Sequence, residues 1–429
     1  MTLTVVGMGK IGLPLAVEFA RNGVKTIGTD INPTVVALVN DSREPFPGEA
    51  DLGENLAGVI EAGILISRTD TTASVAESDV VVVVVPLLVD SKATPDFRAL
   101  DAATRDIAAG LQTGTLVCYE TTLPVGTTRD RFVPMLEEGS GLEFGKDFHV
   151  AFSPERVFSG RIFADLRRYP KLVGGVDTTS GVKAVEFYEQ ALAFDDRPDL
   201  DRANGVWDLG SSEAAEMAKL AETTYRDVNI GLANQFALFA GQRGIDIYAV
   251  IQACNSQVFS HIHQPGISVG GHCIPVYPQL YLWNDEDASI VSQARAANEA
   301  MPIRSVDLIE QAHGDLTGQR VVVFGLAFRG GVKETAFSGT FPLVAELVAR
   351  GAEVTVHDPL HSDAELGTYD FVAYQSGDPV DVAVIHTDHS EYRGLTKDDL
   401  PEVRTILDGR ALTKPEDWIG VKRVVLGVG

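Results

Sequence analysis

The chain of 429 residues is too long for one hydrophobic core, so we expect two or three domains. With 45% hydrophobic and 22% charged residues, its composition is that of an ordinary soluble protein. The net charge of −25 disfavours nucleic acid and anionic membranes as partners, because phosphate groups are bound by clustered positive charge. Three cysteines without a Cys-x-x-Cys pair, and no apparent leader or membrane span, predict a cytoplasmic protein.

The first segment reads as a strand, a glycine turn, a helix and a second strand. The strand covers residues 3–6, the turn residues 7–12, and the next strand residues 24–29, which end at Asp30. Glycines in such a turn let the backbone approach a pyrophosphate, whose charge then lies at the helix N-terminus. Asp30 would bind a ribose 2′-hydroxyl and repel a 2′-phosphate, so this pattern favours NAD over NADP. The expected contacts of the cofactor in this turn are Gly7, Gly9, Lys10, Ile11 and Gly12.

Further apolar strands are expected at residues 79–85, 115–120 and 149–152, with helical patterns between them. Such alternation predicts a parallel sheet covered on both faces, whose ligands bind at the carboxyl ends of the strands. The residues that fall at those ends are Pro86, Glu120 to Thr122 and Ser153 to Glu155.

A basic stretch follows these strands. Its members are Arg156, Arg161, Arg167, Arg168 and Lys171, with only Asp165 as an acid among them. It is either a local pocket for an anionic substrate or a surface helix with solvated charges.

Residues 195–204 read as a linker, and a long helix follows it. Ser211 or Ser212 can cap this helix, whose pattern continues to about Ala240. A helix of about 30 residues is about 45 Å long, enough to connect domains or to form a dimer core. On it Lys219, Thr223 and Arg226 share one face.

A lone cysteine, Cys273, lies in the glycine turn 270–275. A thiolate that adds to an aldehyde gives a thiohemiacetal, which can be oxidised to a thioester and then cleaved by water. Together with the dinucleotide turn, this cysteine predicts oxidation through a covalent intermediate. The alternatives are a small buried hydrophobe and a zinc site with His261, His263 and His272, although no second cysteine closes such a site.

A second α/β unit begins near residue 319. A strand at residues 320–324 leads into the turn 325–329, a helix follows from about Gly339, and a strand at residues 353–356 ends at Asp358. This turn lacks the full dinucleotide fingerprint, so the unit is expected to bind a mononucleotide or nothing.

Taken together, these motifs and their order resemble the UDP-glucose/GDP-mannose dehydrogenase family. The resemblance implies an α/β fold of two Rossmann-like, doubly wound parallel-sheet domains joined by a long central helix that forms a homodimer. The implied segments are an NAD-binding domain at 1–200, a helical dimerisation region with the cysteine loop at 206–300, and a UDP-sugar-binding domain at 301–429. Members of the family oxidise the C6 alcohol of a sugar nucleotide to a carboxylate with two NAD per turnover.

The resemblance also implies roles for single residues. Cys273 matches the nucleophile, Lys219 a lysine that stabilises oxyanions, Thr122 a threonine that orders water, and Glu155 a glutamate near sugar and cofactor. Thr223 stands at a further catalytic position. The implied cofactor contacts add Pro86, Thr122 and Lys333 to the glycine turn and Asp30. The implied substrate contacts are Glu155, Arg156, Val157, Lys219, Arg226, His263, Gly266, Gly270, Gly271, Phe328 and Arg329, and no metal is implied.

Three positions depart from the family pattern. Thr223 replaces an asparagine, Tyr277 replaces an aspartate, and Lys333 opens a Lys-Glu-Thr-Ala stretch in place of Arg-Glu-Ser-Pro. Lysine keeps the positive charge of arginine but loses its bidentate fork. Because Tyr277 removes a carboxylate, thioester hydrolysis is the step that this change affects most.

The segment that follows Glu155 looks more like the N-acetylhexosamine branch than the glucose branch, and the stretch 263–266 leans the same way. The expected substrate is therefore UDP-ManNAc or UDP-GlcNAc, with UDP-glucose as the alternative. A non-catalytic protein that binds NAD and a UDP-sugar is the alternative from another class, and the two departures Thr223 and Tyr277 motivate it.

Overall fold

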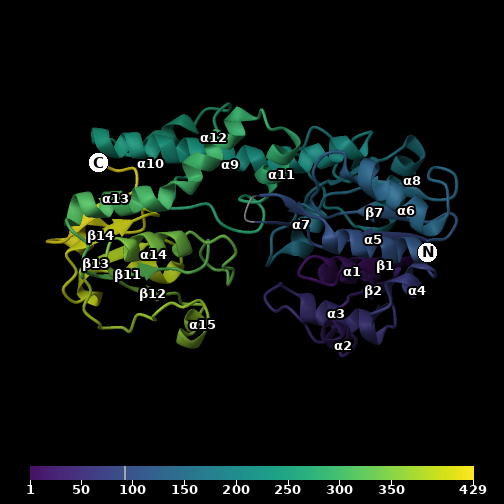
Figure 1. The fold of residues 1–429 in the computed structure, drawn as a ribbon, viewed down its shortest axis with the longest axis horizontal. Coiled ribbons are helices and arrows are strands. Elements are labelled where there is room, and N and C mark those ends of the chain that lie inside the picture. Colours follow the sequence, from purple (N-terminus) through teal and green to yellow (C-terminus); the bar gives the residue numbers. More distant parts are fainter. Residues whose placement is uncertain (91–92) are drawn as a thin grey trace. The chain divides into compact units, whose positions relative to one another are not determined.

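The computed structural model describes residues 1–90 and 93–429, which divide into two compact units, Met1–Ala221 and Glu222–Gly429 (Figure 1). Helix α9 (Ser212–Arg243) begins in the first unit and ends in the second. The expected central segment, residues 206–300, is therefore shared between the two units. At 32 residues, α9 confirms the long helix, and the Ser211 hydroxyl accepts the N–H of Ala214 at 3.1 Å as its cap.

The first unit is built on an eight-stranded sheet in the order β10-β9-β8-β7-β4-β1-β2-β3. All neighbouring strands in it are parallel except β8 and β9. The strands are β1 (Thr2–Val6), β2 (Lys25–Thr29), β3 (Leu65–Arg68), β4 (Val80–Val83), β7 (Leu116–Tyr119), β8 (His149–Phe152), β9 (Lys171–Gly175) and β10 (Val206–Asp208). A separate antiparallel pair, β5 (Leu88–Val89) and β6 (Pro95–Asp96), lies between β4 and α5 in the sequence.

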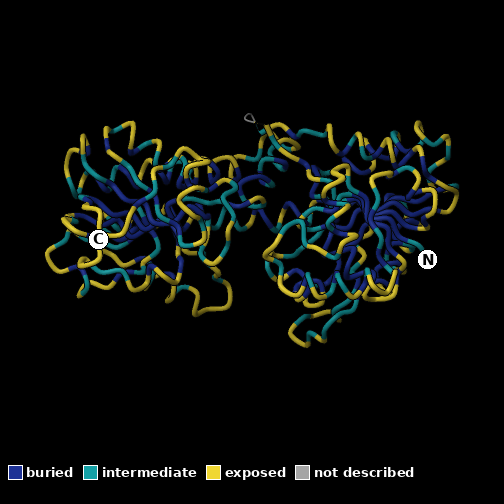
Figure 2. Tube along the Cα trace, turned by 90° about the horizontal axis from the view of Figure 1, so that it is seen from below, coloured by how far each residue is buried: buried dark blue, intermediate teal, exposed yellow. Residues whose placement is uncertain are grey.

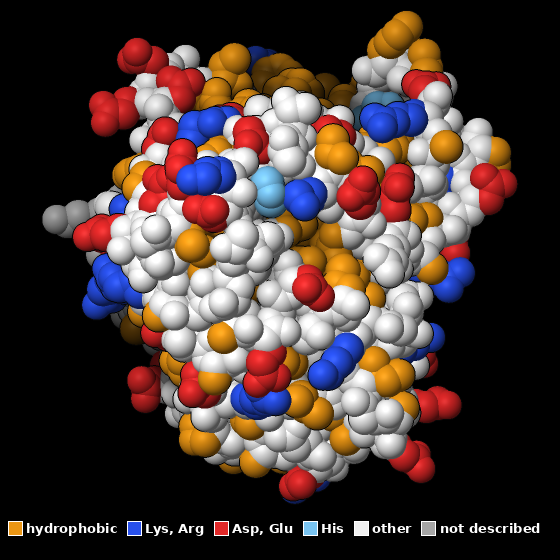
Figure 3. All heavy atoms as spheres, turned by 90° about the vertical axis from the view of Figure 1, so that its right-hand side faces the viewer, with side chains coloured by type: hydrophobic (Ala, Val, Ile, Leu, Met, Phe, Trp, Pro, Cys, Tyr) orange, Lys and Arg blue, Asp and Glu red, His pale blue; other side chains and the backbone are white. Residues whose placement is uncertain are grey.

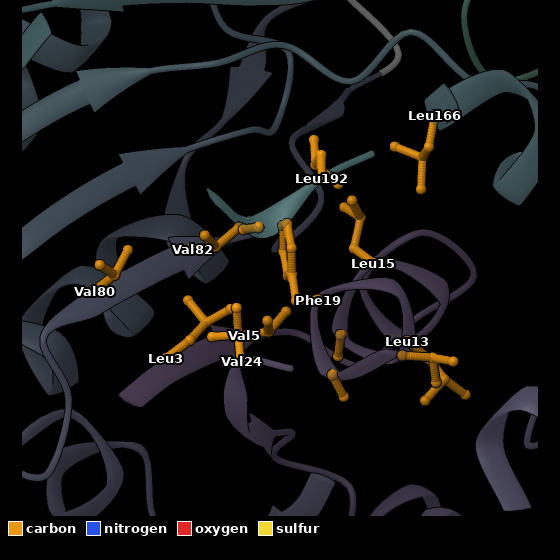
Figure 4. Close-up of a cluster of buried hydrophobic side chains, with 14 of the residues drawn as sticks. Leu3, Val5, Leu13, Leu15, Phe19, Val24, Val80, Val82, Leu166 and Leu192 are labelled. Carbon is orange, nitrogen blue, oxygen red and sulfur yellow. The ribbon is translucent and has the colours of Figure 1, made fainter. Parts of the chain in front are cut away.

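Helices cover both faces of this sheet. The helices are α1 (Gly12–Arg21), α2 (Pro33–Asn40), α3 (Leu52–Glu61), α4 (Thr71–Val75), α5 (Arg98–Gly110), the π-helical turn η1 (Thr128–Phe132), α6 (Val133–Ser140), α7 (Ile162–Arg168) and α8 (Thr178–Ala191). On one face Phe19 of α1 packs 5.7 Å from the ring of Phe187 of α8, inside a cluster that includes Leu3 and Val5 of β1 (Figure 4). Helices α4, α5 and α6 contact one another in turn, and α4 lies against β1 and β2. The strands are the buried centre of the unit (Figure 2).

The second unit carries a five-stranded, fully parallel sheet in the order β12-β11-β13-β14-β15. Its strands are β11 (Arg320–Phe324), β12 (Glu353–His357), β13 (Val382–Ile385), β14 (Thr405–Asp408) and β15 (Lys422–Val425). Its helices are α10 (Ile247–Cys254), α11 (Tyr277–Asn284), α12 (Ser289–Glu299), α13 (Met301–His313), α14 (Thr340–Ala349) and α15 (Asp363–Gly367), with 3₁₀ turns η2 (Ser390–Gly394), η3 (Lys397–Asp399) and η4 (Pro415–Trp418).

The two faces of this second sheet are covered differently. Val321 and Val323 of β11 belong to a cluster with α13 and α14, whereas Val322 and Phe324 belong to one with aromatic side chains, among them Trp418. This alternation is the period-two pattern of a strand buried on both faces. The prediction of an α/β fold with two Rossmann-like sheets and a long central helix is confirmed, with the difference that short 3₁₀ turns and aromatic rings cover one face of the second sheet.

Charged side chains are dispersed over the surface. On the face drawn in Figure 3, Lys and Arg stand among Asp and Glu rather than in one patch. In the described part of the chain, no helix is both long and apolar enough to span a bilayer.

Candidate active site

The glycine turn between β1 and α1 leaves a place for a ligand beside the backbone. Gly7 has φ +96°, a conformation that side chains rarely adopt, and its N–H donates to Thr29 O at 2.8 Å. A Cβ on Gly12 would lie 1.9 Å from Gly7 O, so the turn can close only with glycine there. A Cβ on Gly9 would meet no protein atom within 4 Å. The open side of Gly9 is where the backbone can accept a pyrophosphate, and these residues therefore fit a dinucleotide.

Asp30 is oriented by the backbone of the same turn. Its Oδ2 accepts the N–H of Met8 at 3.0 Å and its Oδ1 accepts the N–H of Asn32 at 2.8 Å. Each carboxylate oxygen retains acceptor capacity for a ribose hydroxyl. The residue after it, Ile31, is 91% exposed, so this end of β2 is open.

The other strand ends continue the same edge of the sheet. Strands β1, β4, β7 and β8 are consecutive neighbours, so Pro86, Thr122 and Glu155 follow the carboxyl ends of adjacent strands. Pro86 is exposed and Thr122 is buried. The neighbouring Thr121 hydroxyl donates to Val85 O at 2.6 Å, which ties the β4 and β7 ends together. The sequence-based expectation that these residues gather at one edge agrees with the topology.

Lys219 of α9 reaches this edge from within the first unit. Its Nζ donates to the backbone oxygen of Glu155 at 2.5 Å, and its residue exposure is 7%. The Glu155 carboxylate in turn accepts the ammonium of Lys171 at 2.8 Å. Lys219 and Glu155, both assigned to the site, are therefore hydrogen-bonded to each other. Lys171, which the sequence-based site did not contain, is bonded to Glu155 as well.

The basic stretch after β8 does not form one anion pocket. Arg161 pairs with Asp165 and Arg167 with Asp195, while Lys171 is buried. Arg156 donates to Pro170 O at 3.3 Å and lies 5.9 Å over the ring of Tyr169. Val157, also expected at the substrate, packs against the core of the first unit. Most of these charges are thus satisfied by neighbours from the same unit.

The cysteine loop belongs to the second unit and leads into α11. Cys273 is partly exposed, and its backbone oxygen accepts the N–H of Tyr277 at 2.9 Å. A Cβ on Gly270 would lie 2.4 Å from Cβ of Phe328, and Gly271 has φ +91° with its N–H donated to Ala336 O at 2.8 Å. The glycines are therefore required because the loop lies directly on the 328–336 segment, which brings Gly270, Gly271 and Phe328 together as expected.

Helix α9 holds the segment that precedes this loop. The Gly266 N–H donates to Oδ1 of Asn234 at 2.9 Å, and the His263 N–H donates to Oδ1 of Asn229 at 2.8 Å. The ring of His263 lies edge-on to Tyr225, with centroids 5.9 Å apart, and burial lowers the pKa of His263. Side-chain amides on one helix thus fix the approach to Cys273.

The remaining predicted residues of the second unit lie at several places. Thr223 is fully buried, and Arg226 Nε contacts Glu222 O at 3.5 Å within α9. Arg329 is exposed, with its guanidinium 5.8 Å from the ring centroid of Phe328. The ammonium of Lys333, expected at the cofactor, forms a half-exposed ion pair with Glu365.

Arg410 is a residue that the sequence-based site missed. Its Nε donates to His386 O at 2.9 Å and its Nη2 to Phe328 O at 3.2 Å, while Nη1 would lie 3.2 Å from a Cβ on Gly266. It therefore connects two residues assigned to the substrate. Its place just beyond the carboxyl end of β14 is the signal that could have found it.

Asp358 ends β12 as Asp30 ends β2, but its carboxylate is saturated. Oδ2 accepts the N–H groups of Leu326 and Ala327 at 2.7 and 3.0 Å and contacts His389 at 3.2 Å. Oδ1 contacts Nδ1 of His361 at 2.9 Å, and the side chain is fully buried. Although burial opposes it, the hydrogen bonds from the two histidines and the backbone hold the pKa of Asp358 well below its usual range.

Within residues 1–90 and 93–429, no three or more His, Cys, Asp and Glu side chains are grouped so that they could hold a metal ion. Cys118, Cys254 and Cys273 are all free thiols.

Sequence models of three domains match this chain. They are described as the NAD binding domain, the central domain and the UDP binding domain of one family, and match residues 1–192, 213–300 and 322–415. The chain belongs to the UDP-glucose/GDP-mannose dehydrogenase family. It is an oxidoreductase that uses NAD, as the glycine turn and Asp30 predict, and its second sheet is the UDP-binding one.

Relatives named as nucleotide-sugar dehydrogenases match nearly the whole chain. The UDP-N-acetyl-D-mannosamine dehydrogenase of Pyrococcus horikoshii is 35% identical over an alignment of 424 residues that covers 96% of each chain. A solved UDP-D-ManNAc dehydrogenase from the same organism superposes with a TM-score of 0.88 at 32% identity, covering 100% of this chain and 99% of that one. A UDP-glucose dehydrogenase of Pyrobaculum islandicum gives 0.86 at 25% identity, covering 100% and 98%. The family resemblance seen in the motifs is therefore confirmed.

Proposed function

We propose that this dehydrogenase oxidises the C6 alcohol of a UDP-N-acetylhexosamine to the uronate in a four-electron reaction. The observation that carries the proposal is a partly exposed cysteine, Cys273, on a glycine-constrained loop in a chain with an NAD-binding domain. An alcohol dehydrogenase that stops at the aldehyde needs no nucleophile. A thiol that adds to the aldehyde carbon makes a second oxidation accessible.

NAD supplies the hydride acceptor, and Gly7, Gly9, Gly12 and Asp30 would hold it. The thiolate of Cys273 adds to the aldehyde to give a thiohemiacetal, whose oxidation leaves a thioester that water cleaves to the acid. Lys219 is suited to stabilise the alkoxide and the oxyanions, because an ammonium in a water-poor site favours developing negative charge. Buried Thr122 and Thr223 are suited to orient the substrate and water through their hydroxyl groups.

UDP-ManNAc and UDP-GlcNAc are the substrates we favour. The relative that is 35% identical over almost the whole chain is named for UDP-N-acetyl-D-mannosamine. The segments after Glu155 and at residues 263–266 support the same branch. UDP-glucose is the alternative substrate. It is included in the assay below because a UDP-glucose dehydrogenase has a similar fold.

We also propose that the enzyme is a homodimer through α9. Leu232, Phe236 and Phe239 follow one another at i, i+4 and i+7 and are 43%, 39% and 56% exposed in the single chain. Large apolar side chains along one helix face are typical of a protein interface. Three free cysteines suit a reducing compartment, so we place the reaction in the cytoplasm.

The test is the stoichiometry of the reaction. Purified protein with excess NAD and limiting UDP-ManNAc, UDP-GlcNAc or UDP-glucose should form two NADH per sugar consumed, and mass spectrometry should find the acid for the preferred sugar. Cys273→Ala should abolish acid formation, whereas Cys254→Ala, the matched control on α10, should keep it. One NADH per sugar, or acid formed by Cys273→Ala, would refute the covalent route. Binding of NAD and sugar nucleotides without turnover would instead support the non-catalytic alternative.

A further inference from the structure

An ion cluster is buried beneath the edge of the first sheet. The ammonium of Lys171, at the start of β9, lies 2.8 Å from Oε2 of Glu120 and 2.8 Å from Oε2 of Glu155. The exposed fractions of the three side chains are 3%, 0% and 11%. The Tyr188 hydroxyl donates to the other oxygen of Glu120 at 2.6 Å. Every oxygen of Glu120 is therefore bonded, and the geometry of the cluster is fixed from three strands and α8.

Such a cluster is poorly explained as a stabiliser of the fold. The desolvation of buried ions offsets most of their attraction, and apolar side chains of similar size often serve stability equally well. Here two carboxylates share one ammonium, so the ionised cluster carries an excess negative charge. Burial raises the pKa of Glu120 to about 7, whereas the attraction and hydrogen bonds of Lys171 and the N–H of Arg156 keep the pKa of Glu155 low against its own burial.

The cluster is coupled to Lys219 through one residue. Oε2 of Glu155 is held by Lys171 and its Oε1 accepts the N–H of Arg156 at 2.7 Å, so the side chain is fixed at both oxygens. The backbone oxygen of the same residue accepts the ammonium of Lys219. Movement of the Glu155 side chain would therefore displace the backbone oxygen of Glu155, to which the Lys219 ammonium donates.

We propose that Lys171 and Glu120 are positioning residues of this dehydrogenase: they hold Glu155 so that its backbone oxygen binds Lys219, and the charge on Glu120 sets how readily Lys219 releases its proton. The inference rests on the proposed catalytic role of Lys219. It assigns a function to two buried residues that do not themselves contact the reacting groups.

The groups that face the Glu120 carboxylate come from every neighbouring element. They are Cys118 of β7, Glu155 after β8, Lys171 of β9 and Tyr188 of α8, while Lys219 of α9 is reached through the backbone oxygen of Glu155. Burial raises the pKa of the Cys118 thiol and of the Tyr188 phenol, so both stay neutral around pH 7. Glu120 is the member of this set whose charge changes near neutral pH.

The first test needs no turnover. Lys219 is acetylated with acetic anhydride over a range of pH, and its modification is followed by mass spectrometry of the peptide. Glu120→Gln removes a negative charge with little change of shape, so the labelling midpoint of Lys219 should move to lower pH by about one unit. Glu213→Gln, the same substitution on α9 at the half-exposed partner of Arg129, should leave the midpoint in place. Equal midpoints in Glu120→Gln and the wild type would overturn the proposal.

The second test separates positioning from folding. Lys171→Met should lower kcat about 100-fold with the KM for NAD unchanged, since a displacement of about 1 Å at a catalytic group has an effect of this size. Lys171→Arg should recover kcat to within about tenfold, because a guanidinium can bridge the two carboxylates. An arginine variant as slow as the methionine variant, at equal thermal stability, would contradict the inference. A wild type inactive on every sugar would refute the proposed function, and the labelling result would still decide the role of Glu120.

Discussion

Two glycines of the first turn, Gly12 and Gly9, should respond in opposite ways to the same added methyl group. A Cβ on Gly12 would lie 1.9 Å from Gly7 O and 3.4 Å from Cβ of Val84, so backbone must move to admit it. Overpacking of this kind destabilises by about 2 kcal/mol. A Cβ on Gly9 meets no protein atom within 4 Å, and alanine restricts the unfolded chain, so Gly9→Ala should be neutral or stabilising by about 0.5 kcal/mol.

The effect on NAD binding should follow the opposite order, with Gly9→Ala the more damaging substitution. We expect the pyrophosphate to occupy the open space beside Gly9, so the methyl group of Gly9→Ala would exclude NAD from a fold that is otherwise intact. NAD at about 100 times its Kd stabilises the wild type by about 2.7 kcal/mol. For a domain of this size that amounts to a rise in Tm of about 5–10 °C.

Calorimetry with and without NAD measures both effects. We expect Gly12→Ala to lower the Tm of the NAD-sensitive transition by about 4–8 °C. Gly9→Ala should keep the Tm of the free protein and lose the shift with NAD. Gly9→Ala with a wild-type NAD shift would refute the location of the pyrophosphate, and Gly12→Ala with a wild-type Tm would refute the steric reasoning.

Two further predictions concern the second unit. Asp358→Asn should destabilise by about 3 kcal/mol at pH 7 in urea unfolding, because the buried negative charge is lost and one of the two oxygens that His361 and His389 contact becomes an NH2 group that cannot accept. Since the folded-state pKa of Asp358 is depressed, its stabilisation is present above about pH 4 and is lost as the pH falls further. The free energy of unfolding of the variant should therefore decrease less steeply below about pH 4 than that of the wild type. An equally steep decrease in both proteins would contradict this. Asn234→Ala should destabilise by about 2 kcal/mol and lower kcat without changing the Kd for NAD, because the N–H of Gly266 loses its acceptor. Unaltered kcat would show that the approach to the cysteine loop is fixed by other contacts.

The cofactor half of the site was predictable because its signals are local. The turn glycines, the strand before them and Asp30 lie within one short stretch of sequence, and each has a steric or electrostatic reason for its position. The edge formed by Pro86, Thr122 and Glu155 followed from strand alternation, because parallel strands end on the same side of a sheet.

The buried cluster could not be found in this way. Lys171 lies in a stretch of basic residues that is typical of a solvated surface, and its partner Glu120 is 51 positions away in sequence. The parallel pairing of β7 with β8 and the antiparallel pairing of β8 with β9 together bring the end of β7 close to the start of β9. Arg410 was missed for a similar reason. Its position at the ligand-binding edge of the second sheet becomes clear only once β14 is known to be an inner strand.

The contrast between Asp30 and Asp358 has a consequence for the order of events. A strand, a turn and an acidic residue at the end of the next strand occur in both units. In the second unit, however, the Asp358 carboxylate is already bonded to backbone N–H groups and to two histidines, so it is not available to bind a ribose. In the proposed four-electron reaction, the first copy alone would then accept both hydrides in succession. On that proposal NADH would have to leave and a second NAD bind before the sugar is fully oxidised, and a bond to Cys273 would keep the sugar at the site during the exchange.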